Sequence, residues 1–318
     1  MLYDNFSQYT PTLGYVVLPF KVGGEHVKLV LPGTVLTLRP SRSEQFSSGS
    51  GTIVRTAERL SITSTEKGST AMSAQTFANG VVPLFMLVHL TGGGGGGSSS
   101  EGLTAGRGGG GGGSCFAIVP LTGDYTFSIG NGGRGGYHTE GEDSGTSNHH
   151  DGVDGEDTKL SSGGIVALIA HGGSGGVAGG SSAAPGGSAS IGGAYWELYI
   201  KGSSVEQYYQ TGGKGAVDSN TIGNTLTCFD LSPFSAGKES MFIEAYLKLA
   251  GTHSSGATWD VGGAGGGASM WTMGGAGGAL AAEGGSGSLG SGGGGGGYHV
   301  GMWIDGGKGG NGFLNIEF

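Results

Sequence analysis

The sequence predicts an all-β fold, in which a small N-terminal β module precedes a β-sandwich-like domain with packed polyglycine segments of polyproline II type. Short runs of β-branched and aromatic residues recur along the chain, each bounded by glycine, asparagine or serine. No stretch combines the apolar period of an α-helix with capping residues, although residues 240–250 also fit a short helix. Glycine supplies 77 of the 318 residues, against about 7% in average proteins.

Residues 1–70 have an ordinary glycine content and are expected to form the N-terminal module. Their alternating or β-branched runs are separated by Gly23-Gly24 and Pro32-Gly33, which are typical of turns. The runs cover residues 15–20, 26–31 and 34–38, and residues 52–63 predict one or two further strands. We expect this module to attach the protein to a larger assembly.

Residues 71–318 are expected to form the glycine-rich domain. Its apolar segments have the length of strands and end at glycine, asparagine or serine. Residues 130–133, with the sequence Gly-Asn-Gly-Gly, indicate a turn. The expected strands are residues 84–90, 115–119, 125–129, 164–169, 194–200, 242–249 and 312–318.

Three uninterrupted runs of six glycines occupy residues 92–97, 108–113 and 292–297. Glycine loses more backbone entropy on ordering than any other residue, so such runs are either flexible linkers or are held by specific contacts. Strand-like segments flank these runs, and no separate domain is evident for a linker to join. We therefore expect the runs to be building elements of the fold.

Ordered polyglycine has two options, a flat sheet or polyproline II, which is a left-handed helix with three residues per turn. Polyproline II has no internal hydrogen bonds, so its amides are free to bond neighbouring segments. Without side chains such helices can lie close together, supported by Cα–H···O contacts. We favour polyproline II over the sheet. The expected segments are residues 92–97, 106–113, 172–180, 262–268 with 274–278, and 284–297.

Charge and composition narrow the class of partner. Asp and Glu number 24 against 15 Lys and Arg, giving a net charge of −9, which disfavours a nucleic-acid partner. No run of about 18 apolar residues is present, so we expect no membrane insertion, and the N-terminus lacks the features of a signal peptide. Cys115 and Cys228 lie in separate strand-like segments, where two reduced core thiols are favoured and a single disulfide stays open.

Residues 76–97 resemble the opening of the glycine-rich domains in tail fibres and minor tail proteins of tailed bacteriophages. Residues 76–91 lead into a hexaglycine run, as a strand of the form T-F-x-x-P-x-G-V does in that family, with Ala78-Asn79 in place of the usual proline. The resemblance covers residues 76–140 and 284–318. Between these two ranges only the general glycine-rich character of the sequence is similar. The other matching segments are residues 114–119, residues 123–136, Tyr298-His299 after the last hexaglycine run, and the ending at 306–318.

The resemblance implies a non-enzymatic virion protein of the tail fibre or tail tip. In some members the glycine runs stack as a polyproline II layer whose connecting loops form the receptor-binding face. By this resemblance, the connections at 137–160, 181–190 and 251–259 are candidates for contact with a host surface glycan or outer-membrane protein. We expect residues 1–70 to bind other virion tail proteins and the chain to form a homotrimer. A virion protein made in the host cytoplasm leaves by lysis, which agrees with the absent signal peptide.

The densest polar cluster lies at residues 149–157. Four of its carboxylates are candidate calcium ligands, but their spacing does not match an EF-hand loop. A solvated acidic loop is the favoured interpretation, and no metal or cofactor is expected. The four are Asp151, Asp154, Glu156 and Asp157.

Aromatic and histidine residues in the glycine-rich surroundings are candidates for receptor binding, because rings in connecting segments suit glycan or protein receptors. Packing against the glycine segments or in the core is the alternative for each of them. The candidates are Tyr137, His138, His149, His150, Trp259, Trp271, Tyr298 and His299.

Catalytic motifs are absent from the sequence. There is no Ser-His-Asp arrangement, carboxylate pair or Cys-x-x-Cys, and residues 130–136 lack the Lys-Ser/Thr of a phosphate loop. We therefore expect no enzyme, although a polysaccharide depolymerase is the enzymatic alternative.

A purely structural virion fibre or decoration protein, on capsid or neck, stays open. An ice-binding polyproline II protein is disfavoured by the irregular glycine spacing.

Overall fold

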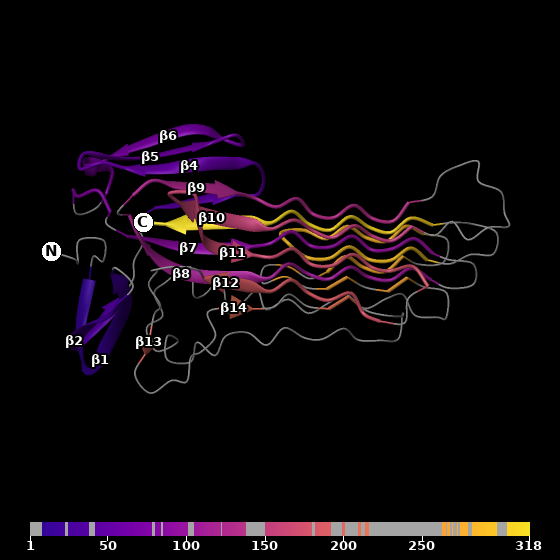
Figure 1. The fold of residues 1–318 in the computed structure, drawn as a ribbon, viewed down its shortest axis with the longest axis horizontal. Coiled ribbons are helices and arrows are strands. Elements are labelled where there is room, and N and C mark those ends of the chain that lie inside the picture. The colour runs from indigo at the N-terminus through magenta and orange to yellow at the C-terminus, as the bar shows by residue number, and fades with distance from the viewer. Residues whose placement is uncertain are drawn as a thin grey trace.

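A computed structural model gives the fold as three antiparallel sheets, two of which form a sandwich from which a set of glycine-rich segments extends (Figure 1). It describes residues 8–22, 25–37, 42–77, 80–83, 85–100, 105–121, 123–137, 150–179, 182–191, 199–200, 209–210, 214–215, 263–264, 266–267, 269, 272, 274–278, 282–297 and 304–318. The predicted strand at 242–249, the predicted helix at 240–250 and most of the predicted strand at 194–200 lie outside these residues.

A three-stranded sheet near the N-terminus is built on a long hairpin. Strands β1 (Gln8–Val22) and β2 (Glu25–Thr37) pair antiparallel, with a register shift between Pro11 and Tyr15. Strand β13 (Tyr199–Ile200) pairs with β1 on its other side. The hairpin confirms residues 15–20, 26–31 and 34–37 as strand. The turn predicted at Pro32-Gly33 is wrong, because β2 continues through these residues.

The second sheet has five strands in the order β14-β8-β7-β15-β3, and every neighbouring pair is antiparallel. Its middle strand is β7, and the C-terminal strand β15 lies between β7 and β3. The strands are β3 (Ser43–Phe46), β7 (Phe85–Thr91), β8 (Ser114–Pro120), β14 (Tyr209–Gln210) and β15 (Phe313–Glu317).

The third sheet has seven strands in the order β12-β11-β10-β9-β4-β5-β6, also antiparallel throughout. A short 3₁₀ helix, Ala74–Thr76, follows its edge strand β6. The strands are β4 (Ser50–Arg55), β5 (Arg59–Ser64), β6 (Gly68–Ser73), β9 (Tyr125–Ser128), β10 (Thr158–Ser162), β11 (Ile165–Ala170) and β12 (Ala189–Ile191).

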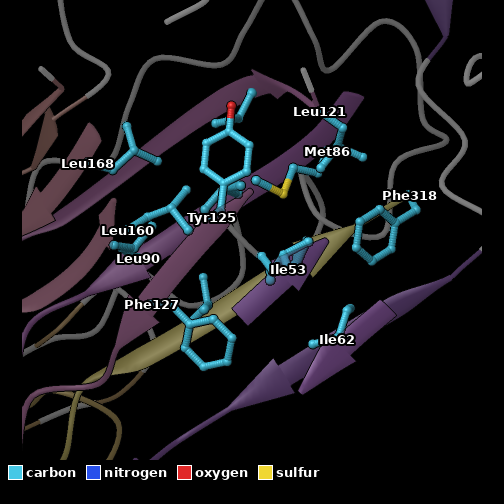
Figure 2. Packing of buried hydrophobic residues seen from close by; sticks show 14 of the residues in the cluster. Ile53, Ile62, Met86, Leu90, Leu121, Tyr125, Phe127, Leu160, Leu168 and Phe318 are labelled. Carbon is cyan, nitrogen blue, oxygen red and sulfur yellow. The ribbon is translucent and has the colours of Figure 1, made fainter. Parts of the chain in front are cut away.

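The hydrophobic core lies between the five-stranded and seven-stranded sheets (Figure 2). Alternate residues of each strand face it, as the two-residue period of a strand requires. Leu90 and Leu314 are register partners in the first sheet, and Phe127 and Leu160 are partners in the second. All four side chains are buried. This sandwich confirms the all-β prediction.

Strands β3 to β6 belong to the same sandwich as the glycine-rich region. Strand β4 pairs with β9, and β3 pairs with β15. The boundary predicted at residue 70 therefore does not coincide with a break between sheets. Among the described strands, those outside the sandwich are β1, β2 and β13, which form a separate sheet. The predicted boundary lies where the glycine content rises. Local glycine content does not report pairing between strands that are far apart in sequence.

Glycine-rich segments leave one end of the sandwich and run side by side away from it (Figure 1). They continue directly from strands: residue 92 follows β7, residue 113 precedes β8, and residue 312 precedes β15. We call them the glycine array. Its described segments are residues 92–100, 105–113, 130–137, 150–157, 171–178, 184–188, 263–264, 266–267, 274–278, 282–288, 290–297 and 304–312.

Hydrogen bonds within the array repeat every third residue. Along residues 92–100, successive amides donate to three different segments in turn, and the fourth amide returns to the first segment. A sheet would return each amide to the same neighbour after two residues. The donor–acceptor pairs are Gly92–Gly113, Gly95–Gly110 and Ser98–Arg107; Gly93–Glu156, Gly96–Val153 and Ser99–His150; and Gly94–Gly310, Gly97–Gly307 and Ser100–Ile304.

A closed ring of six segments surrounds residues 92–97. Three of the six accept hydrogen bonds from this run and three donate to it, and each segment of the ring also bonds to the next. In order around the ring they are residues 130–137, 150–157, 171–178, 105–113, 290–297 and 304–312. Every residue from 92 to 100 is buried.

The three hexaglycine runs are neighbours of one another at the centre of the array. Gly95 donates to Gly110, Gly109 donates to Gly293, and Gly293 donates back to Gly95. A Cβ atom added at Gly95 would lie 2.0 Å from the backbone oxygen of Ser174, and similar backbone contacts occur along all three runs. Uninterrupted glycine therefore marks positions that have no side free for a side chain.

Segments at the surface of the array follow a different pattern, in which every third residue carries a side chain. Residues 171–177 read His-Gly-Gly-Ser-Gly-Gly-Val, and residues 305–311 read Asp-Gly-Gly-Lys-Gly-Gly-Asn. The three-residue period is that of polyproline II. The three-residue period supports the predicted polyproline II conformation of the array. That conformation itself stays a prediction.

Candidate functional site

The far end of the array, opposite the sandwich, is where its described segments end and polar side chains gather. Residues 92 and 113 adjoin strands, so residues 100 and 105 lie at the far end. The same reasoning places residues 137 and 150, and residues 297 and 304, at that end. We call this region the distal end.

Three buried serines terminate the central segment at the distal end. The hydroxyl of Ser98 accepts from the Arg107 amide (2.7 Å), that of Ser99 accepts from the His150 amide (3.1 Å), and that of Ser100 accepts from the Ile304 amide (3.1 Å). The amides that donate to these hydroxyls lie on the same three segments to which the amides of the central glycines donate. The serines therefore join three surrounding segments to the centre where the glycine run ends.

A stack of side chains occupies one side of the distal end. The rings of Tyr137 and His150 are parallel within 6°, with centroids 4.6 Å apart. The guanidinium carbon of Arg134 lies 4.0 Å from the Tyr137 ring centroid, a cation–π distance. Arg134 is exposed, whereas the two rings are partly buried. Two predicted receptor residues, Tyr137 and His150, are thus brought together, 13 positions apart in sequence, because adjacent segments end side by side.

The acidic cluster lies along the array and not in a loop. Asp151 accepts from the Ala178 amide (2.8 Å), Asp154 from the Gly175 amide (2.7 Å) and Asp157 from the Gly172 amide (3.2 Å). We call this series the aspartate ladder. Its spacing of three residues on both segments places each carboxylate beside an amide of the neighbouring segment. The solvated-loop interpretation is corrected accordingly for residues 150–157.

The fourth predicted carboxylate has a similar role on the other side of its segment. Glu156 Oε2 accepts from the backbone amide (3.1 Å) and the side-chain amide (2.9 Å) of Asn131. Among the residues that the structure describes, no group of three or more His, Cys, Asp or Glu side chains is placed to hold a metal ion. The geometry thus accounts for these carboxylates by hydrogen bonds to amides.

Asp157 is the member of the ladder closest to the sandwich. Its Oδ2 lies 3.1 Å from Lys159 Nζ, and its Oδ1 lies 3.1 Å from His171 Nδ1. Partial burial opposes ionisation, but the hydrogen bonds from Lys159, the Gly172 amide and His171 outweigh it, so the pKa of Asp157 lies below its ordinary value. This group stabilises the junction between array and sandwich in its charged form.

The glycine-rich domain family matches residues 67–318, which span the array and most of the sandwich. The chain belongs to this family. No curated protein matches the chain. The matched region of this glycine-rich domain begins just before β6, yet β3, β4 and β5 complete the sheets on which it is built.

Buried polar residues lie on the face of the five-stranded sheet that points away from the described core. His89 and Asn315 are register partners, and the Asn315 side chain donates to Glu317 Oε1 (3.0 Å). Burial lowers the pKa of His89 to about 3. Burial also raises the pKa of Glu317, against the opposing effect of the Asn315 hydrogen bond. Neither His89 nor Glu317 was predicted as a site residue from the sequence, because each occupies an ordinary position in an alternating strand.

Cys115 is a free, buried thiol on β8, and burial raises its pKa to about 12. The prediction of a reduced core thiol is confirmed for this residue, whereas Cys228 lies outside the described residues. In the part of the chain that the structure describes, no helix is long and apolar enough to cross a membrane.

Several predicted site residues lie outside the described part of the chain. They are His138, His149, Trp259, Trp271, Tyr298 and His299, together with the connection at 251–259. Sequence reasoning missed two features of the distal end, namely Arg134 and the serines at 98–100. A signal for Arg134 was present, because Asn131, Arg134 and Tyr137 are spaced by three residues. Such spacing places side chains on one side of a helix that has three residues per turn.

Proposed function

We propose that this glycine-rich domain protein is a non-enzymatic virion component of a bacteriophage tail fibre or tail tip. In this proposal the distal end of the array contacts the host cell surface. The observation that carries it is the gathering of segment ends, with the Arg134–Tyr137–His150 stack, at the end farthest from the sandwich. The resemblance of residues 76–140 and 284–318 to phage tail proteins supports the same function.

The chemistry of the array restricts where recognition can occur. Its centre offers only backbone that is already hydrogen-bonded to neighbouring backbone. Specific contacts require side chains, and these are available at the distal end and along the surface segments of the array. Binding groups are commonly held on connections that a rigid scaffold positions. The array supplies such a scaffold, because its hydrogen-bond pattern repeats every third residue across several segments.

Attachment to the virion is assigned in this proposal to the opposite end of the molecule. The β1–β2 hairpin forms its own sheet there, whereas residues 43–73 are committed to the sandwich. Other tail proteins would bind residues 1–70 mainly through this hairpin, and a homotrimer would present three distal ends together. The partner at the host surface would be a glycan or an outer-membrane protein.

The experiment is a replacement of residues 138–149 by a Gly-Ser segment of equal length. It leaves Tyr137 and residues 150–157 in place, so the array keeps its hydrogen bonds. Purified protein is then tested for competition with phage adsorption. The wild-type protein is expected to compete, and the replaced protein to lose competition or change its host range.

A matched control replaces the turn Gly163-Gly164 between β10 and β11, at the sandwich end. This variant should compete like the wild type. Competition that survives replacement of residues 138–149 would remove this connection from the receptor contact. A wild-type protein that does not compete would contradict receptor binding and favour a purely structural virion protein.

A further inference from the structure

Arg134 is a cation held over an aromatic ring, and its guanidinium donors bond to no residue in the part of the chain that the structure describes. Its guanidinium is held over the Tyr137 ring, and within the described residues it makes no ion pair or side-chain hydrogen bond. An arginine fixed over a ring loses less freedom on binding than a mobile one. Its fork of N–H groups matches an oxyanion with two parallel oxygens.

The carboxylates of segment 150–157 are engaged with amides, and Glu156 accepts from Asn131 on the segment that also carries Arg134. Segment 150–157 lies between residues 130–137 and residues 171–178. Its Asp151 and Asp154 accept amide hydrogen bonds from Ala178 and Gly175, on the side away from Arg134. Among the residues that the structure describes, no carboxylate forms an ion pair with Arg134, although the chain as a whole carries a net charge of −9.

Tyr137 acts as a positioning residue for this cation. His150 stacks on its ring, and Ser99 holds the His150 backbone through two hydrogen bonds of 3.1 and 3.2 Å. The stack is thus anchored to the buried centre of the array. A sugar ring has little free aromatic surface here, because the Tyr137 ring already contacts Arg134 and His150.

We propose that Arg134, positioned by Tyr137 and His150, binds the oxyanion of an acidic glycan, either a carboxylate or a phosphate, at the distal end. This inference rests on the proposed function, since it names the ligand class of the same receptor-binding end. Arg107 is not part of this subsite, because its segment lies on the opposite side of residues 92–100 in the ring of six.

The first test measures binding of D-glucuronate, D-glucose 1-phosphate and D-glucose by ligand-observed NMR. Wild-type protein should bind at least one of the two acids and not glucose. Arg134→Gln should weaken that binding about tenfold, as loss of a charge-assisted bidentate contact implies. Arg134→Lys should restore it only partly, because an ammonium keeps the charge without the fork.

Matched variants separate this subsite from general charge effects. Lys308→Gln removes an exposed cation on a neighbouring segment and should leave binding within about twofold. Tyr137→Phe keeps the ring and should bind like the wild type, whereas Tyr137→Leu removes it and should bind more weakly. Equal losses in Arg134→Gln and Lys308→Gln, or no preference for either acid over glucose in the wild type, would overturn the proposal.

Competition with phage adsorption distinguishes this inference from the proposed function. If wild-type protein competes and Arg134→Gln competes equally well, the oxyanion subsite is wrong while receptor binding stands. If the wild type does not compete, receptor binding fails, and the NMR measurement still decides whether Arg134 binds the oxyanion. The expected result is competition by the wild type and Lys308→Gln, with a clear loss in Arg134→Gln.

Discussion

The sandwich and the glycine array hold the same chain in two different ways. In the sandwich, side chains alternate with a two-residue period and the apolar half is buried between sheets. In the array, the repeat is three residues and the centre contains no side chains at all. One region is stabilised mainly by burial of apolar surface, and the other by backbone hydrogen bonds and close packing.

This difference changes what each region tolerates. A core position of the sandwich needs a side chain of a particular volume, whereas a central position of the array needs none. The array also orders glycine, whose backbone loses the most entropy on folding. Its segments therefore depend on one another, and on strands that fix where each begins.

The largest expected effect comes from adding a methyl group at the centre of the array. In Gly95→Ala the Cβ would lie 2.0 Å from Ser174 O and 2.4 Å from Ser174 C, which are backbone atoms that cannot rotate away. We expect a loss above about 4 kcal/mol, in the range of exceptional single substitutions. Thermal unfolding and soluble yield measure it.

The control for this substitution is Gly123→Ala. The nearest atom to its added Cβ is Ser162 Oγ at 3.8 Å, an ordinary contact. Its stability should be close to that of the wild type. A Gly95→Ala protein as stable as Gly123→Ala would show that the centre of the array is not closely packed.

The sandwich should respond to the opposite change, the removal of side-chain volume. Leu314 on β15 is fully buried between its partners Leu90 and Phe46. Leu314→Ala should cost about 2–5 kcal/mol through lost burial and the cavity left behind. Denaturant unfolding measures it, with Leu314→Met as the volume-conserving control at less than about 1.5 kcal/mol. Equal stability of the alanine and methionine variants would contradict this core assignment.

The buried polar face of the five-stranded sheet predicts a pH effect. The pKa of His89 is about 3 in the folded protein, against an ordinary value of 6.5. At a pH between these two values, the unfolded chain therefore binds a proton at His89 that the folded protein does not bind. Stability should therefore fall by about 2 kcal/mol from about pH 7 to about pH 5 on account of His89. Unfolding at a series of pH values checks this, and His89→Gln should remove the effect.

Glu317 acts in the opposite direction, because burial raises its pKa. Its raised pKa favours the protonated form in the folded state, so its contribution to stability is lost as pH rises. In Glu317→Gln the loss on acidification should therefore be steeper than in the wild type. A shallower loss in that variant would contradict the opposed titrations.

The smallest expected effect is at the surface of the array. Asp154→Ala removes the 2.7 Å hydrogen bond to the Gly175 amide and should cost about 1 kcal/mol. Asp154→Asn retains an acceptor oxygen and should cost less. Thermal unfolding compares the two variants, and identical stabilities would show that the aspartate ladder does not support the array.

Much of the sandwich could be predicted from sequence, because its strands carry the two-residue apolar alternation. The strands at 85–91, 114–120 and 313–317 were all expected from this pattern. Their order in the sheets was not, since pairing of β3 with β15 joins residues more than 260 positions apart, and local composition does not report such pairing.

The array could be predicted only in its centre. Hexaglycine runs indicated segments without side chains, but residues 130–133 were interpreted as a turn and residues 137–160 as a loop. Both regions include surface segments of the array, where one residue in three is not glycine. The sequence Asp-Gly-Val-Asp-Gly-Glu-Asp at 151–157 carries this triplet spacing. Its carboxylates obscured the period, because acidic clusters are more typical of loops and cation sites.

Amide hydrogen exchange of residues 92–97 tests the central claim most directly. If the glycine run is enclosed by six hydrogen-bonded segments, its amides should be protected to the same degree as those of β7, which precedes it. Exchange at the rate of an unstructured peptide, while β7 remains protected, would show that the run is a flexible linker and would contradict the array.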